Sequence, residues 1–494
     1  MPPKRSSPLA DNNVQPYRMH VSQKYLDLTK QKLELARLPR EPQGPTMAAQ
    51  QSAFGVPKSD LEPLIDIWVE DYDWREQEKF YNDSLPQFRG TFNGARIHFV
   101  HRRSPSPNAI PLLFVHGFPE SFIAVSRMID ALCNPPSGPG HENVPAFHVV
   151  CPSIPGFGFS DPIHEEANAL PTTASIFDGL MKGLGYRQYI THGSGWAFRI
   201  CRMLAVGHSD SCLAVHTVNP EVPQPQRGLG YPVDDPLNPS IAQSAPHGIL
   251  QQFSERPQTL SYALCDSPPG LLAYMLDAIR PAPFSGSPHR SHSAESMSNH
   301  SSPVASRPSY SPQSSVVGTP GPGRSPQARR SPLKVSPYTS KTSSPQTPQT
   351  MQFPEVHNPW SPIAIINWTM IYWLPGPEVA LRWLANSAAL VPSLWMGQSN
   401  VPLGISHFRE SVPGSGTGQT PPQWLEAYHR VAMVRRREGR VRYPAWERPA
   451  DLVMDIRELA GIVTSVPAAP VGNMDMLSPM GPIVPSAVGP VFLQ

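Results

Sequence analysis

The stretch IPLLFVHGFP, residues 110–119, decides the fold class of this chain. Its first six residues form a continuous apolar run, which is typical of a strand buried on both faces of a parallel sheet. The run ends at His116-Gly117, where a glycine permits the tight turn that follows such a strand. Comparable runs and helix-length stretches alternate after it: runs at 147–151 and from 189, helices at 120–133, 170–184 and 196–206. This alternation predicts an α/β fold with a doubly wound, mostly parallel sheet.

A hairpin precedes this alternating region. QFRGTF (87–92) and RIHFVH (96–101) flank Asn93-Gly94, which is the residue pair that two-residue hairpin turns favour. Ligands of doubly wound sheets bind at the carboxyl ends of the strands. The loops after residues 115, 151 and 191 are therefore the places where we expect chemistry.

Composition separates an ordered part of the chain from a disordered one. Hydrophobic residues make up 39% of the 494 residues, and proline accounts for 63, more than twice its usual share of roughly 5%. Serine and proline dominate 285–350, where Leu333 is the only leucine and Glu295 the only acid. A segment so poor in apolar residues cannot offset the entropy of ordering, so it is predicted to be disordered. Its Ser-Pro dipeptides beside arginine (324–334) suit phosphorylation, although a solvated insertion is the simpler interpretation.

Charge and cysteine usage exclude several classes of protein. Forty Lys and Arg stand against 38 Asp and Glu, a net charge of +2 that argues against a nucleic-acid binder. The five cysteines are scattered and form no CxxC pair, so they read as reduced thiols rather than a disulfide framework or a zinc site. No uninterrupted apolar run reaches the ~18 residues of a membrane span. We expect a cytoplasmic protein without a transmembrane segment, metal or cofactor; a homo-oligomer remains compatible with the sequence.

The loop after the third strand carries the most specific motif. His192-Gly193-Ser194-Gly195-Trp196-Ala197 has small residues at 193 and 197, two positions either side of 195. This is the spacing of a nucleophile elbow, a sharp turn that exposes one residue between a strand and a helix. The backbone N–H groups of the HGFP turn, at Gly117 and Phe118, are candidates for an oxyanion hole beside it.

With these motifs the chain resembles the epoxide hydrolase family, microsomal type. The resemblance also rests on YRMHVSQKYLDLTKQKLELARLP (17–39), YDWREQEKFYNDSLPQFRGTFNGARIHFVH (72–101), RPQTLSYALCDSPPGLLAY (256–274), MIYWLPGPEVALRWL (370–384) and AWERPADLVMDIREL (445–459). It implies an α/β-hydrolase fold with a helical cap and an N-terminal meander. The implied division is a disordered start (1–15), an N-terminal extension (16–90), core (91–220), cap (221–284), the Ser/Pro insertion (285–350), cap (351–395), core (396–464) and a flexible tail (465–494).

The family mechanism implied by this resemblance needs an elbow carboxylate that attacks the epoxide. A histidine oriented by an acid then activates water, and two cap tyrosines donate hydrogen bonds. Matching the motifs puts Gly195 at the nucleophile position, Arg442 at the histidine position and Glu410 at the acid position. Glycine has no side chain and arginine cannot act as a base, so we expect the covalent mechanism to be absent. A Glu410–Arg442 ion pair would replace the acid–base pair; the tyrosine positions fall near Ile249 and at Trp383 or Leu384.

Three further side chains are candidate acids or bases: His116, His192 and Tyr262. The expected function is that of an epoxide hydrolase-like protein for a lipophilic epoxide-type molecule, from detoxification or secondary metabolism, without an aspartyl ester. One alternative is non-hydrolytic, acid-assisted ring opening or cyclisation, and another is direct attack by water with His192 and Glu410. A third is a catalytically inactive binding or regulatory partner, so enzymatic activity itself stays open.

Overall fold

The computed structural model describes residues 14–41, 55–136, 138, 144–163, 168–225, 256–279, 359–409 and 420–465. All of them belong to one compact unit of the chain. Five predictions lie outside these residues, wholly or almost so: Glu410, the tyrosine position near Ile249, the disordered start except residues 14 and 15, the Ser/Pro insertion at 285–350 and the tail after Ser465.

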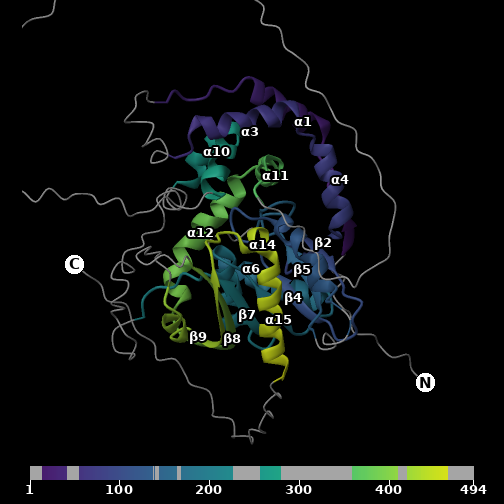
Figure 1. Cartoon of the computed structure of the whole chain (residues 1–494), viewed down its shortest axis with the longest axis vertical. Helices are drawn as coiled ribbons and strands as arrows, with labels where there is room; N and C mark the ends of the chain where they lie inside the picture. Colours follow the sequence, from purple (N-terminus) through teal and green to yellow (C-terminus); the bar gives the residue numbers. More distant parts are fainter. Residues whose placement is uncertain are drawn as a thin grey trace, which may run out of the picture. The chain divides into compact units, whose positions relative to one another are not determined.

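Nine strands form one sheet in the order β1-β2-β3-β5-β4-β6-β7-β8-β9 (Figure 1). The strands are β1 (Gln15–Tyr17), β2 (Gln87–Phe92), β3 (Ala95–Arg102), β4 (Ile110–Phe114), β5 (Phe147–Pro152), β6 (Tyr189–His192), β7 (Cys212–Val218), β8 (Ser399–Arg409) and β9 (His429–Glu438). β1, β2, β3 and β5 pair antiparallel, and every pairing from β5 to β9 is parallel. The predicted doubly wound, mostly parallel sheet is confirmed.

Apolar side chains alternate between the two faces of this sheet. In β4, Leu112 packs into one core cluster and Leu113 into the other, and both are fully buried. Helices α5 (Ile129–Cys133) and α15 (Pro449–Ser465) cover the first face, and α6 (Ala169–Gly183) and α7 (Trp196–Gly207) cover the second. Burial on both faces explains why these strands are continuous apolar runs in the sequence.

The Asn93-Gly94 turn connects β2 and β3 as predicted. Both residues have positive φ, 48° and 81°, which is the conformation that the hairpin turn requires. The helix expected over 120–133 is instead a 3-10 turn, η2 (Phe122–Arg127), followed by the short α5. Helix α13 (Pro422–Glu426) ends before His429, which is buried at the start of β9.

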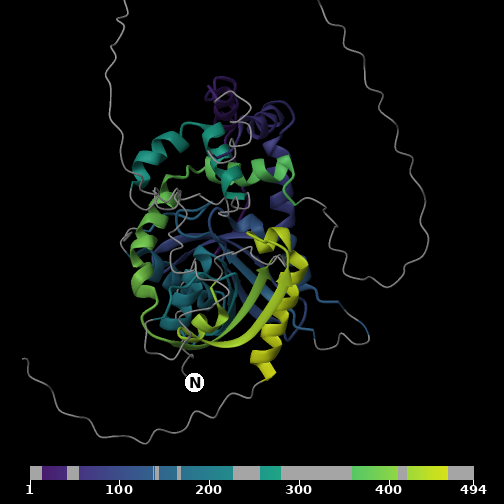
Figure 2. The same cartoon turned by 60° about the vertical axis from the view of Figure 1, so that its left-hand side comes forward.

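Further helices lie beyond the carboxyl ends of the central strands. The teal and green helices α10 (Pro268–Ile279) and α11 (Pro362–Trp373) stand there in both views (Figures 1 and 2). Other helices of the chain are α1 (Gln23–Glu34), α3 (Lys58–Glu70), α4 (Trp74–Ser84), α9 (Pro257–Leu264) and α12 (Glu378–Leu394). Within the described residues, none of the helices combines the length and the hydropathy that a bilayer crossing needs.

Residues of the N-terminal segment hold α11 in place through partly buried hydrogen bonds. Asn367 accepts a bond from the Tyr72 hydroxyl at 2.7 Å and donates one to Gln77 at 2.9 Å. The Trp373 indole N–H donates to the Thr29 hydroxyl of α1 at 2.8 Å. Residues from the first part of the chain therefore fix a helix that follows the Ser/Pro insertion in sequence.

A glycine sets how closely α12 approaches the loop after β5. Gly156 has a φ of 80°, and a Cβ there would overlap the Val379 side chain of α12. Helix α12 carries Trp383, which packs edge-on against Phe157 with ring centroids 5.6 Å apart. The position of α12 over this loop thus depends on the missing side chain at 156.

We expect Gly156→Ala to destabilise the protein more than Gly185→Ala does. Both positions have positive φ, which costs an L-residue about 1–2 kcal/mol, but only position 156 adds a clash, worth about 1–3 kcal/mol more. Urea unfolding of the two variants measures the difference. Adding Val379→Ala to Gly156→Ala should recover the clash component; equal destabilisation of both glycine variants would contradict this packing.

Candidate functional site

The turn between β6 and α7 has the geometry of a nucleophile elbow. Gly195 adopts φ 55° and ψ −119°, is exposed, and has open space where a side chain would project. Gly193 must stay small, because a Cβ there would lie 2.7 Å from the Cβ of Ala197 and 2.9 Å from the sulfur of Cys201. The elbow is therefore built, but its apex carries no reactive group.

The HGFP turn lies directly beside the elbow. A Cβ on Gly117 would lie 3.1 Å from the Ser194 carbonyl oxygen and 2.9 Å from Glu120 Oε2. The Gly117 N–H, expected as an oxyanion donor, donates to that Oε2 at 3.0 Å. Phe118 packs against Tyr372 with ring centroids 5.5 Å apart. The structure thus brings Gly117, Phe118 and Gly195 together, and adds a carboxylate to them.

Glu120 is the functional candidate that sequence reasoning missed. Its side chain is only 7% exposed, and burial raises its pKa from 4.5 to about 7, with Glu447 adding to the rise and the Gly117 N–H opposing it. Among the described residues, Gly117 is its only side-chain hydrogen-bond partner and binds Oε2, which leaves Oε1 available to a ligand. A carboxyl that is half protonated near neutral pH can donate a proton to a reacting oxygen.

His116 links two loops rather than facing a ligand. Its Nδ1–H donates to the Gly117 carbonyl at 2.9 Å, and its Nε2 accepts the Ile154 N–H at 3.1 Å. Burial lowers its pKa to about 4. Both ring nitrogens are hydrogen-bonded to backbone groups, so the neutral imidazole links the loop after β4 to the loop after β5.

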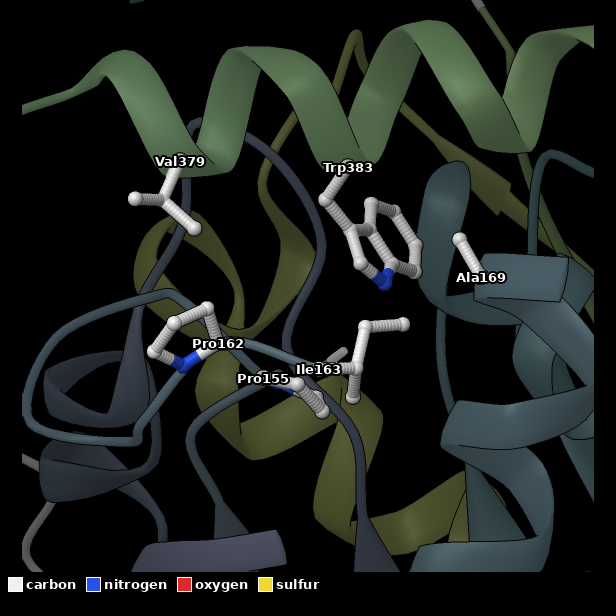
Figure 3. Close-up of a pocket in the computed structure, with 6 residues that line it drawn as sticks. All are labelled: Pro155, Pro162, Ile163, Ala169, Val379 and Trp383. Carbon is white, nitrogen blue, oxygen red and sulfur yellow. The ribbon is translucent and has the colours of Figure 1, made fainter. Parts of the chain in front are cut away.

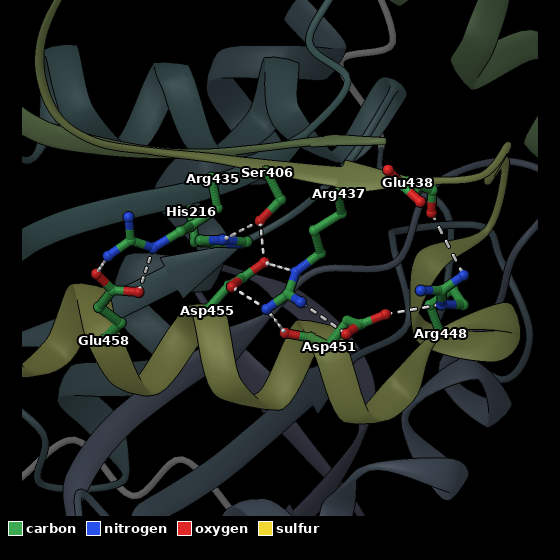
Figure 4. Close-up of polar contacts among 9 residues, drawn as sticks. All are labelled: His216, Ser406, Arg435, Arg437, Glu438, Arg448, Asp451, Asp455 and Glu458. Carbon is green, nitrogen blue, oxygen red and sulfur yellow. Dashed lines mark hydrogen bonds and ion pairs between the residues drawn. The ribbon is translucent and has the colours of Figure 1, made fainter. Parts of the chain in front are cut away.

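His192 is held in a buried polar chain that crosses the parallel strands. Its Nδ1 lies 2.9 Å from Nδ1 of His216, whose Nε2 lies 3.1 Å from the Ser406 hydroxyl. Ser406 donates its proton to Asp455 Oδ2 at 2.6 Å (Figure 4), so His216 Nε2 donates and its Nδ1 accepts from His192. Burial lowers the pKa of both imidazoles, to about 3 for His216, and His192 is a neutral structural residue.

Ion pairs anchor the far end of this chain on α15. Arg437 of β9 donates to Asp455 at 2.5 Å and to Asp451 at 2.7 Å (Figure 4). Asp455 is 1% exposed, and the two hydrogen-bonded partners compensate its buried charge. The strand that ends at the elbow is thereby connected through side chains to the C-terminal helix.

Two further predicted site residues, Arg442 and Tyr262, are exposed. Arg442 is exposed between β9 and α14 (Pro444–Glu447), and its backbone N–H donates to Glu447 at 3.1 Å. Its expected partner Glu410 lies outside the described residues, so their ion pair stays a prediction. Tyr262, a candidate acid or base in the sequence, is 75% exposed on α9.

Aromatic side chains line the space between the elbow and the helices above it. Trp196, the first residue of α7, packs against Trp383 with centroids 6.2 Å apart. The Trp383 indole donates to the Thr173 hydroxyl at 3.0 Å, so its N–H is not offered to a ligand. Beneath α12, an apolar cavity of about 10 Å³ has room for about one water (Figure 3). It is lined by Pro155, Pro162, Ile163, Ala169, Val379 and Trp383.

Two phenols border the HGFP turn. The Tyr372 hydroxyl donates to the Glu120 carbonyl oxygen at 2.6 Å, and Tyr274 of α10 packs against Phe118 at 6.1 Å. Tyr274 was not singled out from the sequence, where it only ends the motif SPPGLLAY. Within the described ranges, no cluster of three or more His, Cys, Asp or Glu suited to a metal ion is found.

Comparison with known proteins relates residues 14–259 to two described families. Residues 14–125 match the model of the epoxide hydrolase N terminus, and residues 110–259 match that of the alpha/beta hydrolase fold. A putative epoxide hydrolase of Stigmatella aurantiaca is 32% identical over 275 residues, and epoxide hydrolase 1 of Oryctolagus cuniculus is 29% identical over 302. These matches cover 53% and 56% of the chain and 59% and 64% of the relatives, so they span about three-fifths of the curated relatives' length.

Solved structures share the fold over most of the chain. The Aspergillus niger epoxide hydrolase superposes with a TM-score of 0.62 and 21% identity, covering 91% of this chain and 96% of its own. The juvenile hormone epoxide hydrolase of Bombyx mori gives a TM-score of 0.64 and 19% identity, covering 92% and 95%. The arrangement of sheet and cap described above is thus an α/β-hydrolase fold.

We expect Glu120→Gln to change how stability depends on pH. A carboxyl whose pKa rises from 4.5 to about 7 on folding makes the folded state bind its proton more tightly. The contribution of Glu120 to the free energy of unfolding is therefore complete below about pH 4.5. It decreases by about 3 kcal/mol as the pH rises through 7. Urea unfolding from about pH 4.5 to about pH 8 should show this loss in the wild type and not in the variant.

The matched control is Glu70→Gln, on the exposed end of α3. It should leave the pH profile unchanged. Parallel stability curves for wild type and Glu120→Gln would contradict a raised pKa at Glu120.

Proposed function

We propose, from the premise that the chain belongs to the epoxide hydrolase family, that it binds a lipophilic epoxide-type molecule and acts on it without a covalent ester at the elbow. The observation that carries the proposal is Gly195. It keeps the elbow conformation, φ 55° and ψ −119°, but offers no oxygen that could attack a carbon. A ring-opening step here must use a nucleophile other than residue 195.

The surroundings of the elbow support a lipophilic ligand. Phe118, Phe157 and Tyr372 form mutual ring contacts with centroids between 5.5 and 6.4 Å apart. Trp196 and Trp383 extend this aromatic surface over the first turn of α7. Such rings contribute large apolar contact area, and the few polar groups at the elbow would orient the ligand on it.

A second candidate function, acid-assisted ring opening, is favoured by Glu120. Its protonated carboxyl would donate the proton to the epoxide oxygen as a ring C–O bond breaks. A hydroxyl of the same molecule would form the new C–O bond at the carbon and return its proton to the Glu120 carboxylate. The product is an isomer of the substrate, and no enzyme nucleophile, metal or cofactor enters the balance.

We expect Gly195→Asp to trap an ester that the wild type never forms. The open space at 195 accommodates the new carboxylate, and a positive φ costs it about 1–2 kcal/mol. Because Arg442 cannot activate water, the ester formed with styrene oxide should persist and appear by intact-protein mass spectrometry as one added substrate mass. Gly195→Asn, which has no nucleophilic oxygen, should stay unmodified; an adduct on the wild type would overturn the proposal.

We expect turnover of an epoxy alcohol to depend on the protonated form of Glu120. With a pKa of about 7, the rate should be constant at lower pH and fall about tenfold per unit above it. Glu120→Gln should lose most of the rate, whereas Glu70→Gln should keep it. In water enriched in oxygen-18 the cyclic product should contain no label. A labelled diol would instead point to hydrolysis by water. Binding without any product would point to an inactive ligand-binding protein.

A further inference from the structure

A group of basic side chains lies at the opposite edge of the sheet from the elbow. Arg102, at the end of β3, pairs with Val149 near the start of β5, so the loop that follows β3 lies at the amino ends of the parallel strands. The elbow follows β6 and lies at their carboxyl ends. A ligand bound to these basic side chains would therefore be separate from the candidate site and from the proposed function.

Three of the basic side chains meet on the phenol of Tyr186, which follows α6. Tyr186 is only 7% exposed, and its hydroxyl oxygen lies 3.0 Å from His101 Nε2 and accepts a hydrogen bond from Arg103 Nε at 3.3 Å. The His148 ring of β5 stacks on the Tyr186 ring, with centroids 5.6 Å apart and planes inclined by 23°. One buried ring thus gathers a guanidinium and two imidazoles, and we call these four residues the Tyr186 cluster.

The bonds within the Tyr186 cluster leave an N–H donor on each of its three basic side chains. His148 Nδ1 accepts the Ser104 N–H at 3.1 Å, so the proton of this neutral ring is on Nε2. The Tyr186 oxygen already accepts from Arg103, so we assign the phenol proton to the bond with His101 Nε2, which leaves the His101 proton on Nδ1. Among the described residues, these two N–H groups and the terminal nitrogens of Arg103 have no acceptor.

No carboxylate balances the Tyr186 cluster in the described part of the chain. None lies there within 4.0 Å of His101, Arg103 or His148, whereas the preceding Arg102 pairs with Asp130 at 3.2 Å. Burial, followed by the positive charges of Arg103 and His148, lowers the pKa of His101 to about 4. Burial and Arg103 also lower the pKa of His148. Because the basic groups disfavour one another's charge, an anion placed among them would be stabilised by all three.

We propose that His101, Arg103 and His148 form a binding site for a phosphate group, either inorganic phosphate or the phosphate of a monoester. A guanidinium binds phosphate oxygens through two parallel N–H bonds, and Nη1 and Nη2 of Arg103 are the nitrogens that would make them. The two imidazole N–H groups would donate to further oxygens. A carboxylate has only two oxygens, whereas a phosphate group offers an acceptor to each of the three side chains, which favours phosphate as the ligand.

Isothermal titration of the full-length protein with inorganic phosphate, near neutral pH and at an ionic strength held constant with sodium chloride, tests the site. Arg103→Met should weaken phosphate binding about tenfold or more because it removes charge-assisted bonds, and Arg103→Lys should keep part of the affinity. Arg430→Met, which removes an exposed arginine from β9, is the matched control and should leave the affinity unchanged. Absence of phosphate binding in the wild type, or an equal loss in both methionine variants, would overturn the proposal.

A second measurement needs no variant to fold. In the wild type, phosphate should shift the imidazole NMR signals of His101 and His148 and leave that of the exposed His20 in place. Unchanged signals of both clustered imidazoles at saturating phosphate would contradict the site.

Titration with O-phosphoserine distinguishes the two sources of the phosphate group. Tighter binding than that of inorganic phosphate would identify a monoester as the ligand, and equal or weaker binding would identify free phosphate; both results uphold the site. Epoxide turnover should be the same in Arg103→Met and in the wild type, because the cluster and the elbow lie at opposite edges of the sheet. The phosphate site and the proposed function can therefore fail independently.

Discussion

The backbone turn between β6 and α7 is the constraint on which the rest of the site depends. Residue 195 must take a positive φ so that the chain can leave the sheet and enter the helix at once. Gly193 and Gly117 must lack a side chain so that the neighbouring segments can pack in contact. These requirements are steric and do not involve the reaction. The elbow therefore does not depend on a carboxylate at its apex, because glycine meets the conformational demand with no strain.

The sequence predicts those parts of the fold that follow from local pattern. Continuous apolar runs identify β4 and β5, Asn93-Gly94 identifies a hairpin, and small residues at 193 and 197 identify the elbow. Each signal is physical and short-ranged, since it reflects burial, a required φ or a close approach. No such local signal in the sequence predicts that 120–133 divides into the 3-10 turn η2 and the short helix α5.

The site itself depends on contacts that sequence does not encode locally. A glutamate after a proline is ordinarily expected on the surface, and only the folded packing around Glu120 reveals its burial. The role of His192 is set by His216, 24 residues away, which in turn meets Ser406, 190 residues further on. Tyr262 shows the same limit, since nothing in its local sequence indicates that its side chain is exposed on α9.

The bond from Tyr372 to the Glu120 carbonyl joins the cap helix α11 to the HGFP turn. A movement of α11 away from this turn would break that bond and would admit water to the buried Glu120 side chain. Hydration favours the ionised carboxylate, so an open cap leaves the residue a poor proton donor. The proton-donating form of Glu120 therefore depends on α11 staying packed against the HGFP turn, because it is burial there that raises the pKa of the carboxyl.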